Sequence, residues 1–376
     1  MRSRGQEMAA GWKGDSMRIG INAALLGAEK GYRQTGISRY ISELAYGLEG
    51  VKQPEDKLIL LGRSPELVND SPVTRIIWEQ TGLPMSSAAH RVDVFHGPMH
   101  VLPMLNRVPG VVTVHDLAFL RYPEQLPAGR RRYLVAATRF SVRKANHVIT
   151  VSQNTANDLI SWLKVPEEKV TAIPLAPAPR IRPVAGRSLD IFRMKWDIDR
   201  PYVVAVGTLE PRKNLPTLLR AFSKIKDQVD HQLVLVGPEG WLTAELKRTL
   251  QELDLGDRLR LTGFVSDEEL GGWYSGADLF AFPSYYEGFG LLTVEAMRCG
   301  TPVLASDTSS FPEVVGDAGV LISPRDEDLW AEMMLALLRD PTRLAAMAEA
   351  GRARADTFSW GRTASETYRV YADVAK

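Results

Sequence analysis

Two acidic residues, Glu287 and Glu295, stand eight positions apart with a glycine-containing loop between them. Glu287 follows the apolar run Leu279–Phe282, which predicts a strand, and Glu295 lies within Leu291–Arg298, a helical pattern closed by Gly300. Carboxylates accept hydrogen bonds well from sugar hydroxyls, and a helix N-terminus between them can hold a phosphate. The pair could therefore grip two hydroxylated parts of one ligand.

A plainer interpretation makes Glu287 a loop acid and Glu295 a surface acid of the helix. The neighbours of Glu295 are Leu, Val, Ala and Met, which favours burial. A buried carboxylate needs a partner, so burial would itself indicate a specific contact.

A pair of cations follows the run Tyr202–Val206, which predicts another strand. Gly207 permits a tight turn, and Arg212 with Lys213 stands at the start of the helical pattern Leu215–Gln228. The helix macrodipole disfavours cations at this end, so their placement indicates a bound anion. A diphosphate would meet both cations and the free amides of the helix. The alternative interpretation is a basic turn exposed to solvent.

Strand and helix patterns alternate along the chain, which predicts an α/β fold with parallel sheets covered on both faces. Ligands of such sheets bind at the carboxyl ends of strands, where both charged groups lie. The expected strands are 18–22, 57–61, 92–96, 110–115, 147–152 and 170–173, then 202–206, 232–236, 259–262, 279–282 and 302–305. The expected helices are 37–48, 129–145, 153–163, 215–228, 242–253, 268–275, 291–298, 326–339, 341–355 and 360–374.

A proline-rich stretch over 173–183 interrupts this alternation, because proline breaks both helical and strand periodicity. The division expected from it is a disordered leader over 1–16, an N-terminal Rossmann-like domain over 17–180, a linker over 181–200, a C-terminal Rossmann-like domain over 201–357 and a terminal helical segment over 358–376.

The composition is that of a soluble globular protein, with 376 residues, 45% of them apolar and 24% charged, enough for two α/β domains. A net charge of +1 gives no reason to expect nucleic acid as a partner. The single Cys299 excludes an internal disulfide and a cysteine-rich zinc site, which favours a reducing, cytoplasmic location. No stretch reaches the roughly 20 apolar residues of a membrane span.

The segment from Glu287-Gly288-Phe289-Gly290 through Glu295 to Gly300-Thr301-Pro302-Val303 resembles the E-x7-E signature of glycosyltransferase family 4. Gly207–Leu215 resembles the phosphate-binding turn of the same family. The resemblance runs from Met17 over essentially the whole chain. It implies the GT-B fold, in which two Rossmann-like, doubly wound parallel-sheet domains face each other across a cleft and the final helix returns to the N-terminal domain. It also implies a retaining hexosyltransferase that uses a nucleotide-sugar donor.

In that family the first Glu of the signature contacts the donor sugar and the second the nucleotide ribose. The first half adds a glycine loop near the donor diphosphate, matched by Thr35-Gly36-Ile37, and a histidine at the sugar-binding end, matched by His115. A lone histidine is more often a structural imidazole, although the position of His115 at the carboxyl end of a strand counts against that interpretation. His96 is a weaker candidate. The resemblance thus implies catalytic roles for His115, Arg212, Lys213 and Glu287, and donor contacts from Gly36, Ile37, Gly207, Arg212, Lys213, Glu287, Gly288, Phe289, Gly290, Leu291 and Glu295.

Two segments depart from the family pattern. Relatives often have two glycines where this chain has Thr35-Gly36, which makes the backbone less permissive at Thr35. Relatives also commonly carry Gly-Gly before the segment that matches Pro312-Glu313, where this chain has Ser309-Ser310-Phe311. Donor contacts from this second loop are therefore in question.

The family mechanism implies same-face substitution, with the leaving diphosphate helping to take the acceptor proton. Arg and Lys supply positive charge, so no metal and no cofactor is required. The acidic triplets 197–199 and 326–328 are interpreted as structural. The chain looks most like bacterial mannosyltransferases of surface-polysaccharide assembly, which favours GDP-mannose as donor and a glycan or lipid-linked saccharide as acceptor. UDP-glucose and UDP-N-acetylglucosamine stay open, as do the linkage and the oligomeric state.

A basic helical pattern carries Arg130–Arg132, Arg139, Arg143 and Lys144 together with Phe140. It predicts either peripheral contact with the inner face of the membrane or, the favoured interpretation, a core-facing helix with a solvated basic face. For the chain as a whole, the alternative functions are a GT-B epimerase or phosphorylase and a non-catalytic sugar-nucleotide-binding module.

Overall fold

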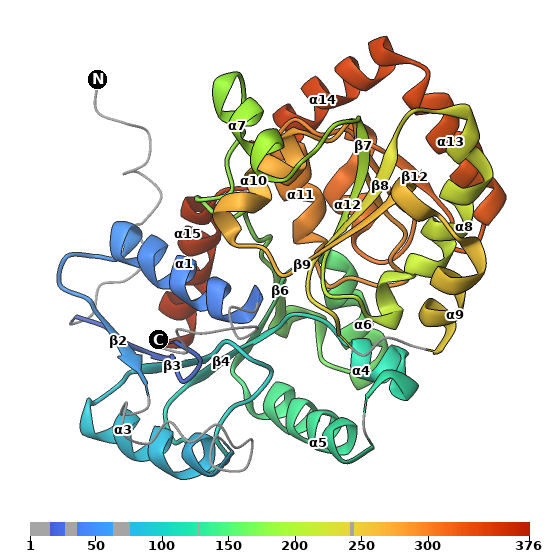
Figure 1. The fold of residues 1–376 in the computed structure, drawn as a ribbon. Helices are drawn as coiled ribbons and strands as arrows, with labels where there is room; N and C mark the ends of the chain where they lie inside the picture. Colours follow the sequence, from blue (N-terminus) through green and yellow to red (C-terminus); the bar gives the residue numbers. More distant parts are fainter. Residues whose placement is uncertain (1–15, 27–35, 63–75, 127, 241–243) are drawn as a thin grey trace. The chain divides into compact units, whose positions relative to one another are not determined.

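The computed structural model describes residues 16–26, 36–62, 76–126, 128–240 and 244–376. Two compact units make up the chain. Unit 1 comprises Met1–Val151, Thr155–Pro174 and Trp360–Lys376, and unit 2 comprises Ser152–Asn154 and Leu175–Ser359. Each unit is built around its own six-stranded sheet (Figure 1), and every strand pair in both sheets is parallel.

The sheet of unit 1 has the order β2-β1-β3-β4-β5-β6. Its strands are β1 (Arg18–Asn22), β2 (Lys57–Leu61), β3 (Val94–Gly97), β4 (Gly110–Val114), β5 (His147–Thr150) and β6 (Val170–Ala172). The accompanying helices include α1 (Gly36–Val51), α3 (Leu83–Ala89), α4 (Ala118–Arg121), α5 (Ala128–Lys144), α6 (Gln153–Leu163) and α15 (Trp360–Val374). Strands β3 and β4 are buried at every position, as expected of a central parallel sheet.

The last helix, α15, belongs to unit 1 although it is distant from it in sequence. It packs against α1, and its Tyr368 hydroxyl donates to Asp56. Asp56 also accepts a hydrogen bond from the backbone amide of Met17, at 2.7 Å, just before β1. One buried carboxylate therefore joins the start of the first strand to the end of the chain.

The sheet of unit 2 has the order β12-β11-β10-β7-β8-β9. Its strands are β7 (Tyr202–Val206), β8 (Gln232–Val236), β9 (Leu259–Gly263), β10 (Leu279–Phe282), β11 (Val303–Ser306) and β12 (Val320–Ile322). The accompanying helices include α7 (Arg187–Lys195), α8 (Leu215–Ile225), α9 (Ala244–Leu253), α10 (Asp267–Ser275), α11 (Leu291–Arg298), α12 (Phe311–Val315), α13 (Glu327–Leu338) and α14 (Pro341–Ala355).

The expected linker over 181–200 is part of unit 2 and contains α7, so it is not a free connection. Phe192 of α7 packs edge-on against the buried Trp273, with ring centroids 5.2 Å apart. This aromatic contact anchors α7 to the unit. The edge strand β12 was not expected from the sequence either.

Each sheet has a point at which the strand order reverses. In unit 2 the neighbours β7 and β10 flank it, since the chain runs from β7 to β8 and β9 on one side and from β10 to β11 and β12 on the other. In unit 1 the corresponding neighbours are β1 and β3. Ligands of doubly wound sheets bind outside the carboxyl ends of the strands at such a switch point.

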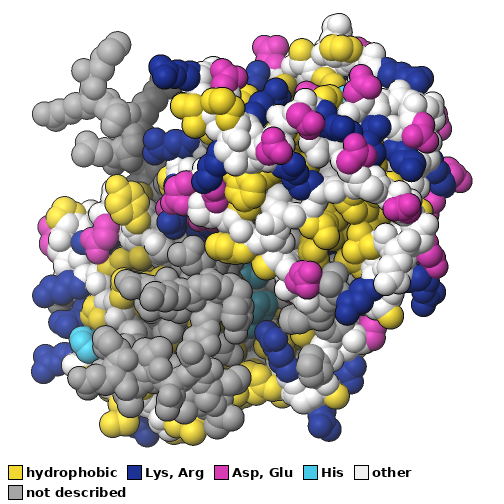
Figure 2. Space-filling model, in the orientation of Figure 1, with side chains coloured by type: hydrophobic (Ala, Val, Ile, Leu, Met, Phe, Trp, Pro, Cys, Tyr) yellow, Lys and Arg dark blue, Asp and Glu magenta, His cyan; other side chains and the backbone are white. Residues whose placement is uncertain are grey.

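Helix α5 turns its apolar residues Leu134 and Val135 toward the core of unit 1 and leaves Arg132, Arg139 and Arg143 exposed. This is the core-facing arrangement that the sequence favoured. On the face drawn in Figure 2, acidic and basic side chains of unit 2 are interspersed, without a broad basic area among the described residues. Within the part of the chain that the structure describes, no helix has the length and apolar character needed to cross a bilayer.

Candidate functional site

The turn after β7 is shaped by two glycines in close contact. Gly207 has φ +135°, and its amide donates to the carbonyl of Val236 at 2.8 Å. A Cβ on Gly237 would lie 2.2 Å from the carbonyl oxygen of Gly207, so only glycine fits behind the turn. The chain then forms a short 3₁₀ turn, Pro211–Lys213, before α8 begins at Leu215.

Asn214 fixes this turn to the rest of unit 2. Its backbone is left-handed, with φ +53°, a conformation that Asn tolerates better than most residues. Its buried side-chain amide donates to the carbonyls of Pro283, at 3.1 Å, and Pro324, at 2.7 Å. Pro283 directly follows β10, so Asn214 holds the two loops of the switch point at a set distance.

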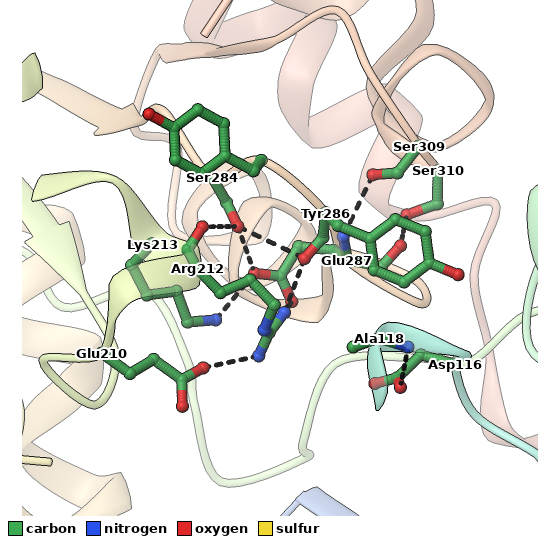
Figure 3. A network of polar contacts seen from close by, with 12 residues as sticks. Asp116, Ala118, Glu210, Arg212, Lys213, Ser284, Tyr286, Glu287, Ser309 and Ser310 are labelled. Carbon is green, nitrogen blue, oxygen red and sulfur yellow. Dashed lines mark hydrogen bonds and ion pairs between the residues drawn. The ribbon is translucent and has the colours of Figure 1, made fainter. Parts of the chain in front are cut away.

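The predicted site residues Arg212, Lys213 and Glu287 meet in one ionic cluster (Figure 3). The Lys213 Nζ lies 2.7 Å from one carboxylate oxygen of Glu287, and an Arg212 guanidinium nitrogen lies 2.8 Å from the other. Arg212 also pairs with Glu210 at 2.7 Å and donates to the Tyr286 carbonyl at 2.6 Å. The cations of the loop after β7 and the acid of the loop after β10 therefore form a single ion-pair network.

Burial and charge act against each other in this cluster. Burial would raise the pKa of Glu287, but Arg212 and Lys213 outweigh it and lower that pKa to about 2. Burial lowers the pKa of Lys213, which Glu287 opposes and Arg212 reinforces. The Lys213 Nζ also lies 5.0 Å from the ring centroid of Phe282, a cation–π distance. The carboxylate is consequently ionised throughout the physiological range.

Serines not assigned from the sequence hold Glu287 in place. Ser284 donates to its carboxylate at 2.8 Å, the Ser309 hydroxyl accepts from its amide at 3.0 Å, and Ser310 donates to its carbonyl at 3.0 Å. Ser309 has φ +52°, a conformation in which glycine is the usual residue. The two serines of this loop, which stand where the family pattern has glycines, therefore add side-chain hydrogen bonds to the backbone of Glu287.

The glycine loop leads directly into α11. Gly290 is the N-cap residue and is left-handed, with φ +87°. The Phe289 ring is buried edge-on against Phe358, with centroids 5.6 Å apart. Gly288 is buried as well, and Leu291 is the first residue of the helix. The Phe289 side chain thereby anchors the loop at the start of α11.

Glu295 is fully buried, so the interpretation of it as a surface acid of the helix is wrong. Its Oε2 accepts from the hydroxyl of Tyr274, a fully buried residue of α10, at 3.2 Å. The carboxylate thus has the partner that a buried acid requires. Its contact with a ribose stays a prediction.

The first-half candidates lie in unit 1. Gly36 and Ile37 begin α1, whereas Thr35 falls outside the described residues. His115 directly follows β4, and its Nε2 donates to the carbonyl of Pro98 at 2.9 Å. Burial lowers the pKa of His115, against smaller opposing effects of that hydrogen bond and of Asp116.

His96 is a structural residue. It is fully buried within β3, and its two ring nitrogens bind the Thr113 hydroxyl, at 2.8 Å, and the Tyr371 hydroxyl, at 2.6 Å. His96 is therefore the structural imidazole that a histidine near a strand end often is. His115, by contrast, lies just beyond the carboxyl end of β4.

The acidic triplets have local roles. Asp326 caps α13 by accepting from the amide of Leu329 at 3.0 Å, while Glu327 and Asp328 pair with Lys224 at 2.6 and 2.7 Å. Asp199 lies 3.7 Å from the neighbouring Arg200. Among the described residues, no three His, Cys, Asp or Glu side chains group as a metal site would need.

Comparison with known proteins defines the class. The model of the glycosyl transferases group 1 matches residues 187–354, and that of glycosyltransferase family 4 matches residues 35–176. The two all-parallel sheets form a GT-B fold. The chain belongs to glycosyltransferase family 4, and it is a retaining glycosyltransferase of the hexosyltransferase type.

Characterised relatives include two mannosyltransferases. The chain is 31% identical over 372 residues to the O-antigen chain mannosyltransferase B of Escherichia coli, which covers 90% of this chain and 96% of the relative. It is 32% identical over 281 residues to the MMP alpha-(1->4)-mannosyltransferase of Mycolicibacterium hassiacum, which covers 70% of this chain and 65% of the relative.

Solved structures support the fold. Sucrose-phosphate synthase from Thermosynechococcus elongatus matches with a TM-score of 0.74 and 22% identity, over 95% of this chain and 99% of that one. Anabaena HepE in complex with UDP and glucose matches with a TM-score of 0.73 and 18% identity, over 95% and 100%. At these identities the likeness extends to the fold alone.

The ion pairs of Glu287 predict a pH-dependent contribution to stability. The folded pKa, about 2, lies below the unfolded value of roughly 4.3. The stabilisation is therefore complete above pH 4.3 and is lost as the pH falls toward 2. It should amount to about 3 kcal/mol at pH 7, with about half of it lost by pH 3.

Urea unfolding of wild type and Glu287→Gln at pH 7 and pH 3 measures this effect. The difference in free energy of unfolding between the two proteins should shrink at pH 3. Glu252→Gln, at an exposed position of α9, is the matched control and should show no such trend. A Glu287→Gln deficit that stays constant with pH would contradict the ion-pair account.

Proposed function

We propose that this enzyme transfers mannose from GDP-mannose to a glycan or lipid-linked saccharide, with retention at the anomeric carbon, on the cytoplasmic side of the membrane. The observation that carries the donor assignment is the similarity over 90% of the chain to an O-antigen chain mannosyltransferase. A second mannosyltransferase among the relatives supports the same sugar. Transfer of glucose or N-acetylglucosamine from a UDP-sugar is the alternative.

The ionic cluster is proposed as the donor diphosphate site. Arg212 and Lys213 are held by Glu287 at 2.8 and 2.7 Å, so their positions are set before a ligand arrives. Preorganised cations stabilise the negative charge that grows on a leaving phosphate without reorganising during the reaction. The backbone from Gly288 to Leu291 would add amide donors to the same group, and the Gly207 turn would allow the diphosphate to approach the chain closely.

The remaining contacts follow from the family match. Glu287 is proposed to bind a hydroxyl of the transferred sugar, Glu295 the ribose, and His115 the far end of the sugar. Gly36 and Ile37, at the start of α1, are proposed to approach the diphosphate. No carboxylate is given the role of covalent nucleophile. The acceptor attacks on the face that the diphosphate leaves, and the departing phosphate oxygen takes the acceptor proton.

A panel of donors tests the sugar assignment. GDP-mannose should raise the melting temperature of the purified enzyme and, with a mannose-containing acceptor, release GDP. UDP-glucose, UDP-N-acetylglucosamine and ADP-glucose should do neither at equal concentration. If the enzyme turns over a UDP-sugar but not GDP-mannose, the donor assignment is wrong and the class of reaction stands. Donor binding without any nucleotide release across the acceptor panel would favour a binding module.

Arg212→Ala tests the diphosphate site. Loss of one charged donor to the leaving group should lower kcat about 100-fold. Arg220→Ala is the matched control, because Arg220 lies in the same unit, is partly exposed and pairs with Glu245 at 3.2 Å. Both variants should melt cooperatively. Unchanged turnover of Arg212→Ala with intact donor binding would exclude the assigned role.

Tyr274→Phe tests the ribose contact through Glu295. The Tyr274 hydroxyl orients the Glu295 carboxylate at 3.2 Å, so its loss should reduce the preference for GDP over 2′-deoxy-GDP about 5-fold. Calorimetric titration with both nucleotides measures that ratio. Tyr202→Phe removes an equally buried hydroxyl, which donates to the Trp273 carbonyl at 2.9 Å, and should leave the ratio unchanged. If wild type, Tyr274→Phe and Tyr202→Phe all show the same preference for GDP over 2′-deoxy-GDP, the proposed contact of Glu295 with the ribose is wrong.

A further inference from the structure

His100 lies at the switch point of the unit 1 sheet, yet the proposed function gives it no role. It follows β3 by three residues, and β3 is one of the two strands that flank the reversal of strand order. Its ring lies beside the ring of His115, which follows the adjacent strand β4, with centroids 5.9 Å apart. Two imidazoles therefore meet at the carboxyl edge of the sheet, where ligands of this fold class bind.

The backbone at His100 is strained and held. Its φ is +62°, in the left-handed region that costs an L-residue roughly 1–2 kcal/mol. Its amide donates to the carbonyl of Thr113 at 3.0 Å, and the Pro98 carbonyl of the same loop accepts from His115 at 2.9 Å. The end of β4 thus fixes this loop from two sides. Strain that the surroundings maintain in this way is concentrated at functional sites.

The hydrogen bonds define the tautomer of each ring. A carbonyl only accepts, so the Nε2 of His115 carries a proton, and in the neutral ring its Nδ1 is an acceptor. The Nδ1 of His100 is buried and has no hydrogen-bond partner among the described residues. A proton there would be an unsatisfied buried donor, so the neutral His100 ring carries its proton on Nε2.

Both rings are neutral at pH 7. Burial lowers the pKa of His100 to about 4, with a further lowering by His115 and a smaller opposing effect of Asp116. Burial likewise lowers the pKa of His115. The pair consequently presents one N–H donor, from His100, and one nitrogen acceptor, from His115. A sugar hydroxyl is both a donor and an acceptor, which matches this pair.

We propose that His100 is a saccharide-binding residue whose Nε2–H donates to an oxygen of the sugar that His115 also binds. This inference rests on the proposed function and adds a residue to it. Aromatic side chains frame the pair, since Phe119 lies 6.1 Å from the His100 ring and Tyr40 lies 4.8 Å from the His115 ring. The saccharide is either the transferred hexose or the acceptor, and kinetic measurements on His100 variants distinguish the two.

Three variants test the proposal. His100→Phe keeps a ring without hydrogen-bonding groups, His100→Ala removes the ring, and His100→Asn keeps an N–H donor in a residue that tolerates the left-handed backbone. His90→Ala is the control, because His90 is an exposed histidine of unit 1 that bonds to the Ser86 carbonyl. We expect kcat/KM to fall at least tenfold in His100→Phe and His100→Ala, with partial recovery in His100→Asn.

The kinetic pattern identifies the sugar. If His100 binds the transferred hexose, KM for the donor rises and hydrolysis of the donor without acceptor slows. If it binds the acceptor, KM for the acceptor rises and donor hydrolysis is unchanged. In both cases GDP, which carries no hexose, binds the variants as tightly as wild type. A loss of GDP affinity or of melting temperature in proportion to the loss of kcat/KM would overturn the proposal in favour of a structural role.

Nitrogen NMR of the histidines separates this proposal from the proposed function. The wild-type spectrum should show neutral His100 protonated on Nε2 and neutral His115 protonated on Nε2 at pH 7. Millimolar methyl mannoside or methyl glucoside should shift the His100 signals, even if no donor in the panel supports transfer. A His100 ring protonated on Nδ1, or signals that no sugar shifts, would overturn the role of His100 irrespective of the enzyme's donor.

Discussion

The ion pairs of Glu287 with Arg212 and Lys213 connect the two loops that carry the candidate site of unit 2. One loop follows β7 and the other follows β10, the strands at which the sheet reverses its order. Asn214, which donates to the Pro283 carbonyl, and Ser284, which donates to the Arg212 carbonyl, reinforce the same connection through hydrogen bonds. A carboxylate buried between two cations is costly to lose, so the geometry of both loops is maintained in the absence of a ligand.

The charges of this cluster decide how it can bind a diphosphate. Arg212 and Lys213 are balanced by Glu210 and Glu287, so the four side chains carry no net charge. Attraction at a distance is therefore weak, and binding has to come from directed hydrogen bonds at short range. The sequence led us to expect that both cations and the helix amides would meet the diphosphate, but it did not show that two glutamates balance the charge of the cations. The glutamates set the direction of each cation, and backbone amides add further donors.

The sequence predicted the elements with strong periodicity and the residues that follow them. Nine of the expected strands and helices, including 202–206, 279–282 and 291–298, agree with the structure in both bounds. Local pattern did not predict the edge strand β12 or helix α7, and α7 depends on an aromatic contact between Phe192 and Trp273. Ser309 and Ser310 were likewise read as a departure, because their hydrogen bonds to Glu287 span more than twenty residues. The sequence shows which residues follow a strand, whereas tertiary contacts decide what they touch.

The histidines of unit 1 illustrate the same limit in a single residue type. His96, His100 and His115 all lie at or near the ends of β3 and β4. His96 has both ring nitrogens bonded within the core, so it has no capacity for a ligand. The Nε2 of His115 donates to the Pro98 carbonyl, which leaves Nδ1 as the acceptor of the neutral ring. His100 has one nitrogen buried without a partner and a backbone held in a strained conformation. Hydrogen-bonding capacity that the fold leaves unused, rather than residue type or proximity to a strand end, therefore distinguishes a binding histidine from a structural one.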